Sequence, residues 1–315
     1  MNRDREDMKS MQEHELERQR PDRTAVFERY RARLFGIAYR MLGSVEDAQD
    51  MIQETYLRWH QADAVTVRSP EAWLIAVATR LSIDRLRRTS LEREGYVGDW
   101  LPEPIATDEP SSPDQRAELA SDLSMAFLLL LERLSPEERA AFLLREVMDA
   151  DYGEIARVLD KSEAACRQIV HRARARVRDD RARFAVAPET KERLVEQFLT
   201  AVQTQNQEAI LALVAEDATW TSDSGGRVSA ARNIIHGAVH IARFVLGLEQ
   251  KWGEIARHEV AWINGEATTV TYVGAQLIST TSIVTDGERL VAFYRVLNPE
   301  KLRHAVRGGN PELRL

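Results

Sequence analysis

The sequence predicts a multidomain protein in which two all-α domains are followed by an α+β domain. Apolar residues recur at three- and four-residue spacing over 24–94 and again over 117–187, as in amphipathic helices. An acidic, proline-rich stretch at 95–116 separates these two parts. Over 188–305, helical segments give way to strand-like runs joined by Asn-Gly and Asp-Gly pairs, which are typical of hairpin turns. Helices followed by a group of strands indicate an α+β domain.

Length and composition agree with this division, because 315 residues with 44% apolar side chains provide a core for two or three domains. No apolar run approaches a bilayer span, and the N-terminus is charged without an apolar stretch, so we expect a soluble cytoplasmic protein that binds no membrane. The single cysteine, Cys166, excludes an internal disulfide and a cysteine-rich zinc site, and we expect neither metal nor cofactor. The net charge of −7 combines separate acidic and basic segments, so local charge decides the partners.

The first helical domain is expected over 24–94, after a flexible segment at 1–23 that mixes charges with few apolar side chains. Its first helix runs until Gly43 stops it, and Ser44 caps a second helix. That second helix presents a polar row formed by Asp47, Asp50, Gln53 and Glu54. A row of this kind is usually only solvent-facing, and the residues alone leave that interpretation open.

A third helix begins at Ser69 and Pro70, an N-cap followed by a first-turn proline. Its second half is basic, with Arg80, Arg85, Arg87 and Arg88.

The stretch 95–116 is expected to be a linker, because it holds four of the ten prolines and its acidic residues face no lysine or arginine over 99–114. Trp100 begins an apolar segment within it. The residues alone leave open whether this tryptophan is a buried anchor or a chance aromatic in a loop.

The second helical domain, 117–187, is expected to contain helices at 117–134 and 137–148 followed by a helix-turn-helix. A short helix ends near Leu159, a tight break follows at 160–161, and Ser162 caps the next helix. That helix has an apolar stripe for packing and a basic side with no acidic residue from 167 to 178. Such a helix suits a DNA phosphate backbone, with its N-terminal side chains placed to meet base edges in a major groove. The alternative is a solvated basic face on an ordinary helix.

The third domain is expected to span 188–305, with a tail at 306–315. Helical patterns at 194–202 and 210–214 precede strand-like runs that form an antiparallel meander. These runs lie around 218–222, 259–263, 268–273, 277–284 and 290–297, with hairpin turns at Asn264-Gly265 and Asp286-Gly287.

Three ordered segments, 47–59, 83–88 and 134–145 followed by the helix-turn-helix, resemble the bacterial RNA polymerase sigma factors of the extracytoplasmic-function (ECF) type. The resemblance implies that core RNA polymerase and promoter DNA are the partners. It implies that the row of Asp47, Asp50, Gln53 and Glu54 binds core polymerase, and that Arg80, Arg85, Arg87 and Arg88 hold the opened downstream promoter element. For the upstream element it implies base contacts from Glu163, Arg167, Gln168 and His171 and phosphate contacts from Arg172, Arg174 and Arg176.

Residues 189–305 resemble the cone-shaped, SnoaL-like (NTF2-like) α+β extension of one subgroup of these sigma factors. Three segments carry this resemblance: the linker motif at 100–104, the glycine-rich loop at 223–227 and the C-terminal motif at 298–302. The loop departs from the subgroup pattern, because Ser224 replaces a glycine and Arg227 a lysine. The resemblance implies regulation in cis by a monomeric chain, with the extension packed on both helical domains through Trp100, Pro102, Asp223, Gly225, Gly226, Arg227, Asn298, Pro299 and Leu302.

Two other classes of protein remain open from the residues. A cone fold often encloses a pocket, and Asp223, His236 and His240 are the available general bases for an enzyme, although no paired carboxylate accompanies them. The pocket could instead bind a small-molecule ligand without turning it over. A dimeric repressor or activator with a helix-turn-helix is the other alternative, but it leaves 47–88 unexplained.

Overall fold

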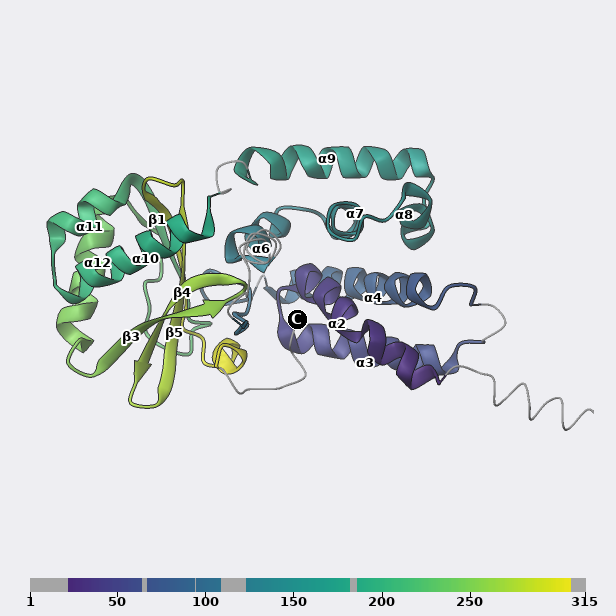
Figure 1. Cartoon of the computed structure of the whole chain (residues 1–315), viewed down its shortest axis with the longest axis horizontal. Helices are drawn as coiled ribbons and strands as arrows, with labels where there is room; N and C mark the ends of the chain where they lie inside the picture. Colours follow the sequence, from purple (N-terminus) through teal and green to yellow (C-terminus); the bar gives the residue numbers. More distant parts are fainter. Residues whose placement is uncertain (1–21, 64–66, 94, 109–122, 182–185, 307–315) are drawn as a thin grey trace, which may run out of the picture.

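The computed structural model describes residues 22–63, 67–93, 95–108, 123–181 and 186–306. It confirms the predicted fold class, with two helical units beside an α+β domain (Figure 1). The predicted flexible segment at 1–23 lies outside the described residues except for Asp22 and Arg23, which start α2, and so do the end of the linker and nearly all of the tail.

The first helical unit consists of α2 (Arg23–Leu42), α3 (Val45–Gln61) and α4 (Pro70–Arg93). The turn between α2 and α3 follows the prediction: Gly43 adopts a left-handed conformation at φ 66°, and the Ser44 hydroxyl accepts a hydrogen bond from the backbone N–H of Asp47. Buried side chains from all three helices, such as Leu34, Ile52 and Leu74, form the core.

The second helical unit consists of α6 (Met125–Glu132), α7 (Pro136–Glu146), α8 (Tyr152–Leu159) and α9 (Glu163–Arg181). Reciprocal capping boxes start two of these helices, Ser135 with Glu138 at α7 and Asp151 with Glu154 at α8. Asp160 ends α8 in a left-handed conformation at φ 53°, so the predicted helix-turn-helix is present. The helix predicted at 117–134 starts at Met125 within the described residues.

The C-terminal domain begins with α10 (Pro188–Gln203) and α11 (Gln207–Leu213). Its described strands form one sheet in the order β2-β1-β6-β5-β4-β3, with a short 3₁₀ helix, η1 (Lys301–His304), after the last strand. The strands are β1 (Val214–Asp223), β2 (Ile235–His236), β3 (Ala256–Ile263), β4 (Glu266–Val273), β5 (Gln276–Thr285) and β6 (Leu290–Val296).

The predicted antiparallel meander holds for β3 to β6, but the prediction of a wholly antiparallel sheet was wrong. A long helix that the sequence analysis did not identify, α12 (Ala238–Trp252), separates β1 from the meander. The chain therefore crosses over the sheet before β3, and β1 pairs with β6 in parallel.

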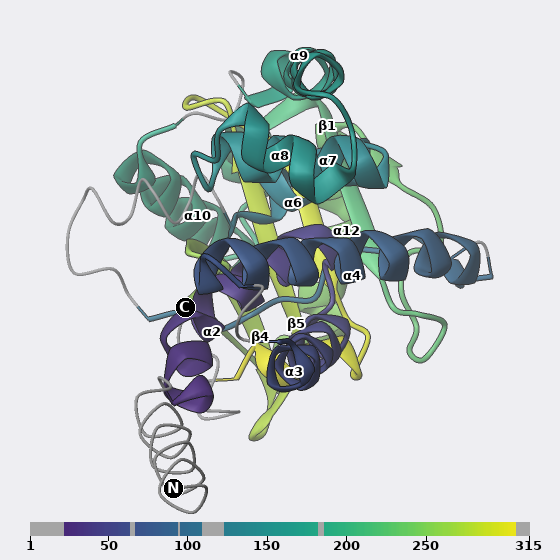
Figure 2. The same ribbon diagram turned by 90° about the vertical axis from the view of Figure 1, so that its right-hand side faces the viewer.

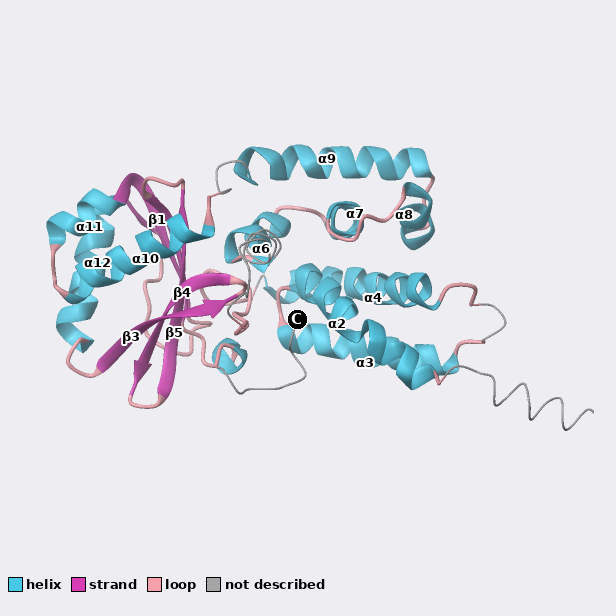
Figure 3. Cartoon of the chain, viewed as in Figure 1, coloured by secondary structure: helices cyan, strands magenta, loops and turns pink. Residues whose placement is uncertain are grey.

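The two faces of the sheet have different partners. Helices α10 and α12 cover one face, where Phe198, Trp220 and Phe293 form the domain core (Figures 2 and 3). On the other face, Leu101 of the linker and Met125 of α6 join strand residues in a single apolar cluster. The C-terminal domain therefore shares a core with the linker and the second helical unit. None of the described helices has the length and apolar composition needed to cross a membrane.

Candidate functional site

The linker, the end of β1 and η1 converge on one buried carboxylate, that of Asp223, which is 0% exposed. Its Oδ1 accepts hydrogen bonds from the Tyr96 hydroxyl at 2.6 Å and from the backbone N–H of Gly225 at 3.1 Å. Its Oδ2 accepts from the backbone N–H of Leu101 at 2.8 Å and from Nζ of Lys301 at 2.6 Å. A buried charge is stable only with such a complete set of partners, so the linker and the C-terminal domain are locked together here. We call these residues the Asp223 hub.

Lys301 supplies the cation of the Asp223 hub. Its Nζ also donates to the carbonyl of Leu101 at 2.6 Å and lies over the rings of Trp100 and Tyr96 at 4.2 and 4.9 Å from their centroids. Burial lowers the pKa of Lys301, and the Asp223 carboxylate acts in the opposite direction.

Arg227, the cation that the sequence analysis placed at this interface, lies elsewhere. It pairs with Glu300 at 3.0 Å within the C-terminal domain, and both side chains are more than half exposed. This pair gives no support to the predicted interdomain contact of Arg227. Lys301 could have been predicted from the sequence, because it belongs to the C-terminal motif at 298–302.

The glycine-rich loop fits tightly against the C-terminal motif. Gly225 has φ +56°, and a Cβ atom there would lie 2.5 Å from Nδ2 of Asn298 and 2.9 Å from the Tyr96 oxygen. Gly226, at φ +70°, approaches Val97 in the same way. The Asn298 amide donates to the Tyr96 hydroxyl at 3.0 Å. The two glycines and Asn298 thus lie beside the linker, together with Tyr96, which none of the three motifs contains.

The two remaining predicted residues of the C-terminal motif, Leu302 and Pro299, differ in exposure. Leu302 is 4% exposed and belongs to the apolar cluster shared with Leu101. Pro299 is exposed, so its predicted interdomain role has no support in the structure.

Trp100 is an anchor and not a free loop aromatic. The Arg93 guanidinium at the end of α4 lies 3.4 Å from the centroid of its indole ring. Arg93 also pairs with Glu132 of α6 at 2.7 Å and donates to the carbonyl of Leu42 at 2.7 Å. Pro102, which is buried, lies beside Gly43. The linker motif thus connects both helical units to the C-terminal domain.

A second group of contacts, which the sequence analysis missed, holds the linker to the start of α3. The Glu103 carboxylate accepts from the Ser44 hydroxyl at 2.8 Å and from the backbone N–H of Val45 at 2.9 Å. The Tyr39 hydroxyl donates to the carbonyl of Glu103 at 2.6 Å, and the amide of Asn264 donates to the Tyr39 oxygen at 2.6 Å. Burial raises the pKa of Glu103, and the two donors at α3 oppose that shift. These residues join the β3–β4 turn directly to the first helical unit.

Two residues of the predicted polymerase-binding row on α3 form ion pairs, and the other two are exposed. Asp47 turns toward α4 and pairs with Arg85 at 2.7 Å, and Glu54 pairs with Arg58 one turn further along at 2.8 Å. Asp50 and Gln53 are exposed. This surface of α3 therefore remains accessible around Asp50 and Gln53.

The basic residues of α4 are mostly engaged. Arg80 donates to the carbonyls of Val158 and Arg157 at the end of α8, at 2.9 and 2.5 Å. Arg87 pairs with Glu137 of α7 at 3.0 Å, and Arg85 is held by Asp47. Arg88 is exposed and makes no ion pair with any other described residue. Arg80 and Arg87, two of the arginines predicted to hold promoter DNA, are thus bound to the helix-turn-helix unit.

The recognition helix α9 lies along the outer edge of the molecule (Figure 1). Gln168 and His171 are exposed, and Arg167 is exposed with its guanidinium paired to Glu163 at 2.7 Å. The three arginines predicted to contact phosphates pair with carboxylates of α7: Arg172 and Arg176 pair with Glu138 at 3.7 and 2.5 Å, and Arg174 pairs with Glu146 at 2.6 Å. The predicted base-contacting side therefore faces solvent, whereas the predicted phosphate contacts have carboxylate partners.

The residues considered for an enzyme do not gather in one place. His236 and His240 are exposed, and the Asp223 carboxylate is committed to the hub. None of the three lines the cavity between α10, α12 and the sheet.

Comparisons with known proteins identify the family. Residues 26–92 match the model of sigma-70 region 2, and residues 124–177 match that of sigma-70 region 4. The chain is 35% identical over 286 residues to the ECF RNA polymerase sigma factor SigJ of Mycobacterium tuberculosis, covering 87% of this chain and 91% of SigJ. It is 26% identical to the probable ECF sigma factor SigI of the same organism, covering 91% of this chain and 98% of SigI.

A crystal structure of M. tuberculosis SigJ superimposes with a TM-score of 0.72 at 33% identity, covering 92% of this chain and 99% of SigJ. The two matched regions coincide with the two helical units, and the relatives extend through the α+β domain. The chain belongs to the ECF family of RNA polymerase sigma factors.

Proposed function

We propose that this sigma factor is regulated in cis, and that it opens promoter DNA with core RNA polymerase only after the C-terminal domain releases the two helical units. The observation that supports the proposal is the set of hydrogen bonds that Tyr96 and Leu101 make to the buried Asp223–Lys301 ion pair of the C-terminal domain. Removing one partner of a buried pair costs about 3–5 kcal/mol, and here that cost falls on the closed arrangement, in which the linker covers the pair.

The closed arrangement obstructs the surface on α4 that is proposed to hold single-stranded promoter DNA. Arg80 cannot reach a phosphate while it donates to the two carbonyls of α8, and Arg87 is held by Glu137. A strand of DNA on this side of α4 needs both guanidinium groups and the space that α8 fills. Separation of the helix-turn-helix unit from α4 is therefore part of the proposed activation.

The proposed polymerase-binding surface stays open in the same arrangement. Asp50 and Gln53 are exposed on α3, on the opposite side of the helical units from α9 (Figure 1). Core polymerase can therefore dock on α3 first, and the binding energy can then be used to separate the two units.

We also propose that the chain acts as a monomer in the cytoplasm, since its interdomain contacts are made within one chain. The C-terminal domain is also proposed to bind a small molecule, independently of the cis regulation.

Transcription in vitro tests the proposed function. Core RNA polymerase free of any sigma factor is mixed with the purified chain and a library of random-sequence duplexes, and the transcripts are sequenced. We expect transcription to start downstream of one shared two-part motif. The templates that carry this motif should give no transcripts with core polymerase alone. Absence of core binding, or transcripts identical to those of core alone, would contradict the proposal.

Replacing Arg167 by Ala is expected to relax the preference at one base of the upstream element, at a cost of about 1–3 kcal/mol on the preferred sequence. Arg174→Ala is the matched variant: it should weaken binding to all sequences and reduce the log-log salt slope by about one. Electrophoretic mobility shift with single-base variants of the selected motif measures both effects. Equal losses for Arg167→Ala on every sequence would exclude a base contact.

A further inference from the structure

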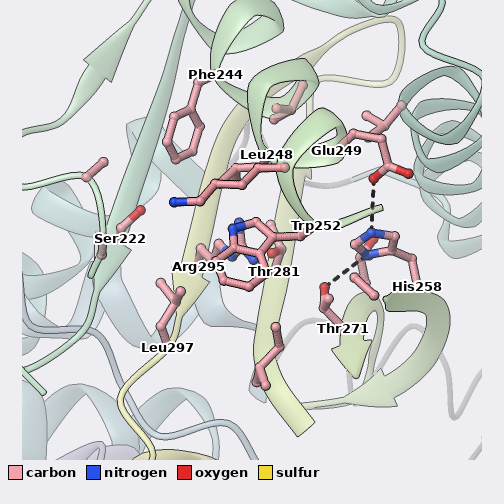
Figure 4. A pocket seen from close by; sticks show the side chains of 18 of the residues that line it. Ser222, Phe244, Leu248, Glu249, Trp252, His258, Thr271, Thr281, Arg295 and Leu297 are labelled. Atoms are coloured by element: carbon pink, nitrogen blue, oxygen red, sulfur yellow. Dashed lines mark hydrogen bonds and ion pairs between the residues drawn. The ribbon is translucent and has the colours of Figure 1, made fainter. Parts of the chain in front are cut away.

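The C-terminal domain contains a cavity of about 720 Å³, partly open to solvent, between α10, α12 and the sheet (Figure 4). Its walls are largely apolar, with Phe198, Trp220, Phe244 and Leu248 among the lining residues. Trp252, which is 44% exposed, also lines it. Ligand pockets commonly have volumes of roughly 300–1,000 Å³ and few polar groups, so this cavity is large enough for a small organic molecule.

A single polar row crosses the sheet at this cavity. Thr269 on β4 lies opposite Thr281 on β5, Thr281 lies opposite Arg295 on β6, and Arg295 lies opposite Ser222 on β1. Residues directly opposite one another across strands share a face of the sheet, and all four line the cavity. The hydroxyl of Thr269 is buried and has no hydrogen-bond partner among the described residues.

Arg295 is the unusual member of this row. Its Nη2 donates to the Ser279 hydroxyl at 3.0 Å, its Nε is buried without a partner, and it forms no ion pair with any described carboxylate. Burial lowers the pKa of Arg295 to about 10, so the guanidinium is still cationic at neutral pH. A half-buried cation in an apolar cavity normally has an anionic partner, and this one has none within the described part of the chain.

The other charged residues at the cavity do not provide that partner. The Glu249 carboxylate lies 3.2 Å from Nε2 of His258, whose Nδ1 lies 3.1 Å from the Thr271 hydroxyl (Figure 4). Lys251 is exposed and cationic. The cavity therefore has excess positive charge at an otherwise apolar site.

We propose that this cavity binds a small organic anion, with a carboxylate on Arg295 and the hydroxyl row and an apolar ring or chain against the aromatic wall. A carboxylate would accept from the unpartnered Nε, and the Thr269 hydroxyl would gain an acceptor. The binding does not depend on the proposed cis regulation. Ser222 immediately precedes Asp223, and Arg295 lies three residues before Asn298, so the ligand would touch the two strand ends that carry the Asp223 hub.

Isothermal titration calorimetry on the full-length chain, without polymerase, tests the site with 2-naphthoate and its neutral counterpart 2-naphthamide. We expect 2-naphthoate to bind with one site per chain and at least about tenfold more tightly than the amide, because a charge-assisted hydrogen bond is stronger than a neutral one. Arg295→Met should reduce 2-naphthoate affinity about tenfold or more and leave the amide unchanged, and Arg295→Lys should retain most of the difference.

Two further variants make the test independent of the stability of Arg295→Met. Arg243→Met removes an exposed arginine from α12 outside the cavity lining and should change neither affinity. Leu248→Trp reduces the volume of the cavity while Arg295 is retained, and it should abolish binding of both compounds. The proposal would be overturned if the acid and the amide bound equally well, or if the unmodified chain did not bind 2-naphthoate. It would also be overturned if Leu248→Trp or a folded Arg295→Met bound 2-naphthoate as tightly as the unmodified chain.

Discussion

Replacing Asp223 by Asn is expected to raise promoter-dependent transcription by this chain at least about tenfold. The substitution leaves Lys301 buried beside two aromatic rings without its carboxylate, at a cost of roughly 3–5 kcal/mol in the closed arrangement. Lys301 regains water when the linker separates, so the open arrangement bears little of this cost. A tenfold increase in transcription requires that the free energy of the closed arrangement rise by only about 1.4 kcal/mol relative to the open one.

Multiple-round transcription and core-binding titrations measure the effect, with Asp217→Asn as the matched control. Asp217 lies on the same strand, β1, but is exposed, and its replacement should leave transcription unchanged. Lys301→Met should activate in the same way as Asp223→Asn. The double variant should be less active than either single variant, because it leaves no unpaired buried charge. Folded Asp223→Asn protein with wild-type or lower activity would contradict the role given to the hub.

Reversing the charge at Asp50, as Asp50→Lys, is expected to weaken core polymerase binding at least about 100-fold and to abolish transcription. Asp50 is exposed on α3 within the row proposed to contact polymerase, and a like charge placed against a complementary surface costs several kcal/mol. Fluorescence anisotropy of labelled chain titrated with core polymerase measures the affinity.

Glu28→Lys is the control for Asp50→Lys, because Glu28 is an exposed acid on α2 of the same helical unit and lies outside the row. It should bind core polymerase normally. Comparable losses for both variants would show that net charge, and not the α3 surface, governs binding.

Local signals in the sequence predicted most of the helical architecture. Gly43 and Ser44 mark the turn between α2 and α3, and Ser135 and Asp160 mark helix ends, because capping depends on the residue itself and its near neighbours. Asn264 and Gly265 similarly mark the β3–β4 turn.

Long-range pairing was harder to predict. The parallel β1–β6 contact joins strands about 70 residues apart, and α12 carries apolar residues that local patterns alone did not place. The interdomain contacts show both outcomes: Asp223 and Trp100 were expected at an interface through the motifs at 223–227 and 100–104, whereas Tyr96 lies in neither motif and Asn264 was predicted only as a turn residue. Their roles arise only when segments more than 100 residues apart meet.

Distance measurement by double electron–electron resonance tests the central claim, that the closed arrangement separates on core polymerase. Spin labels are attached to Ala25→Cys on α2 and Ala175→Cys on α9, both exposed positions, in a chain whose buried Cys166 is replaced by Ala. The free chain should give one short, narrow distance distribution, and saturating core polymerase should replace it with a longer one. An unchanged distribution in a complex that initiates transcription would contradict regulation by domain separation.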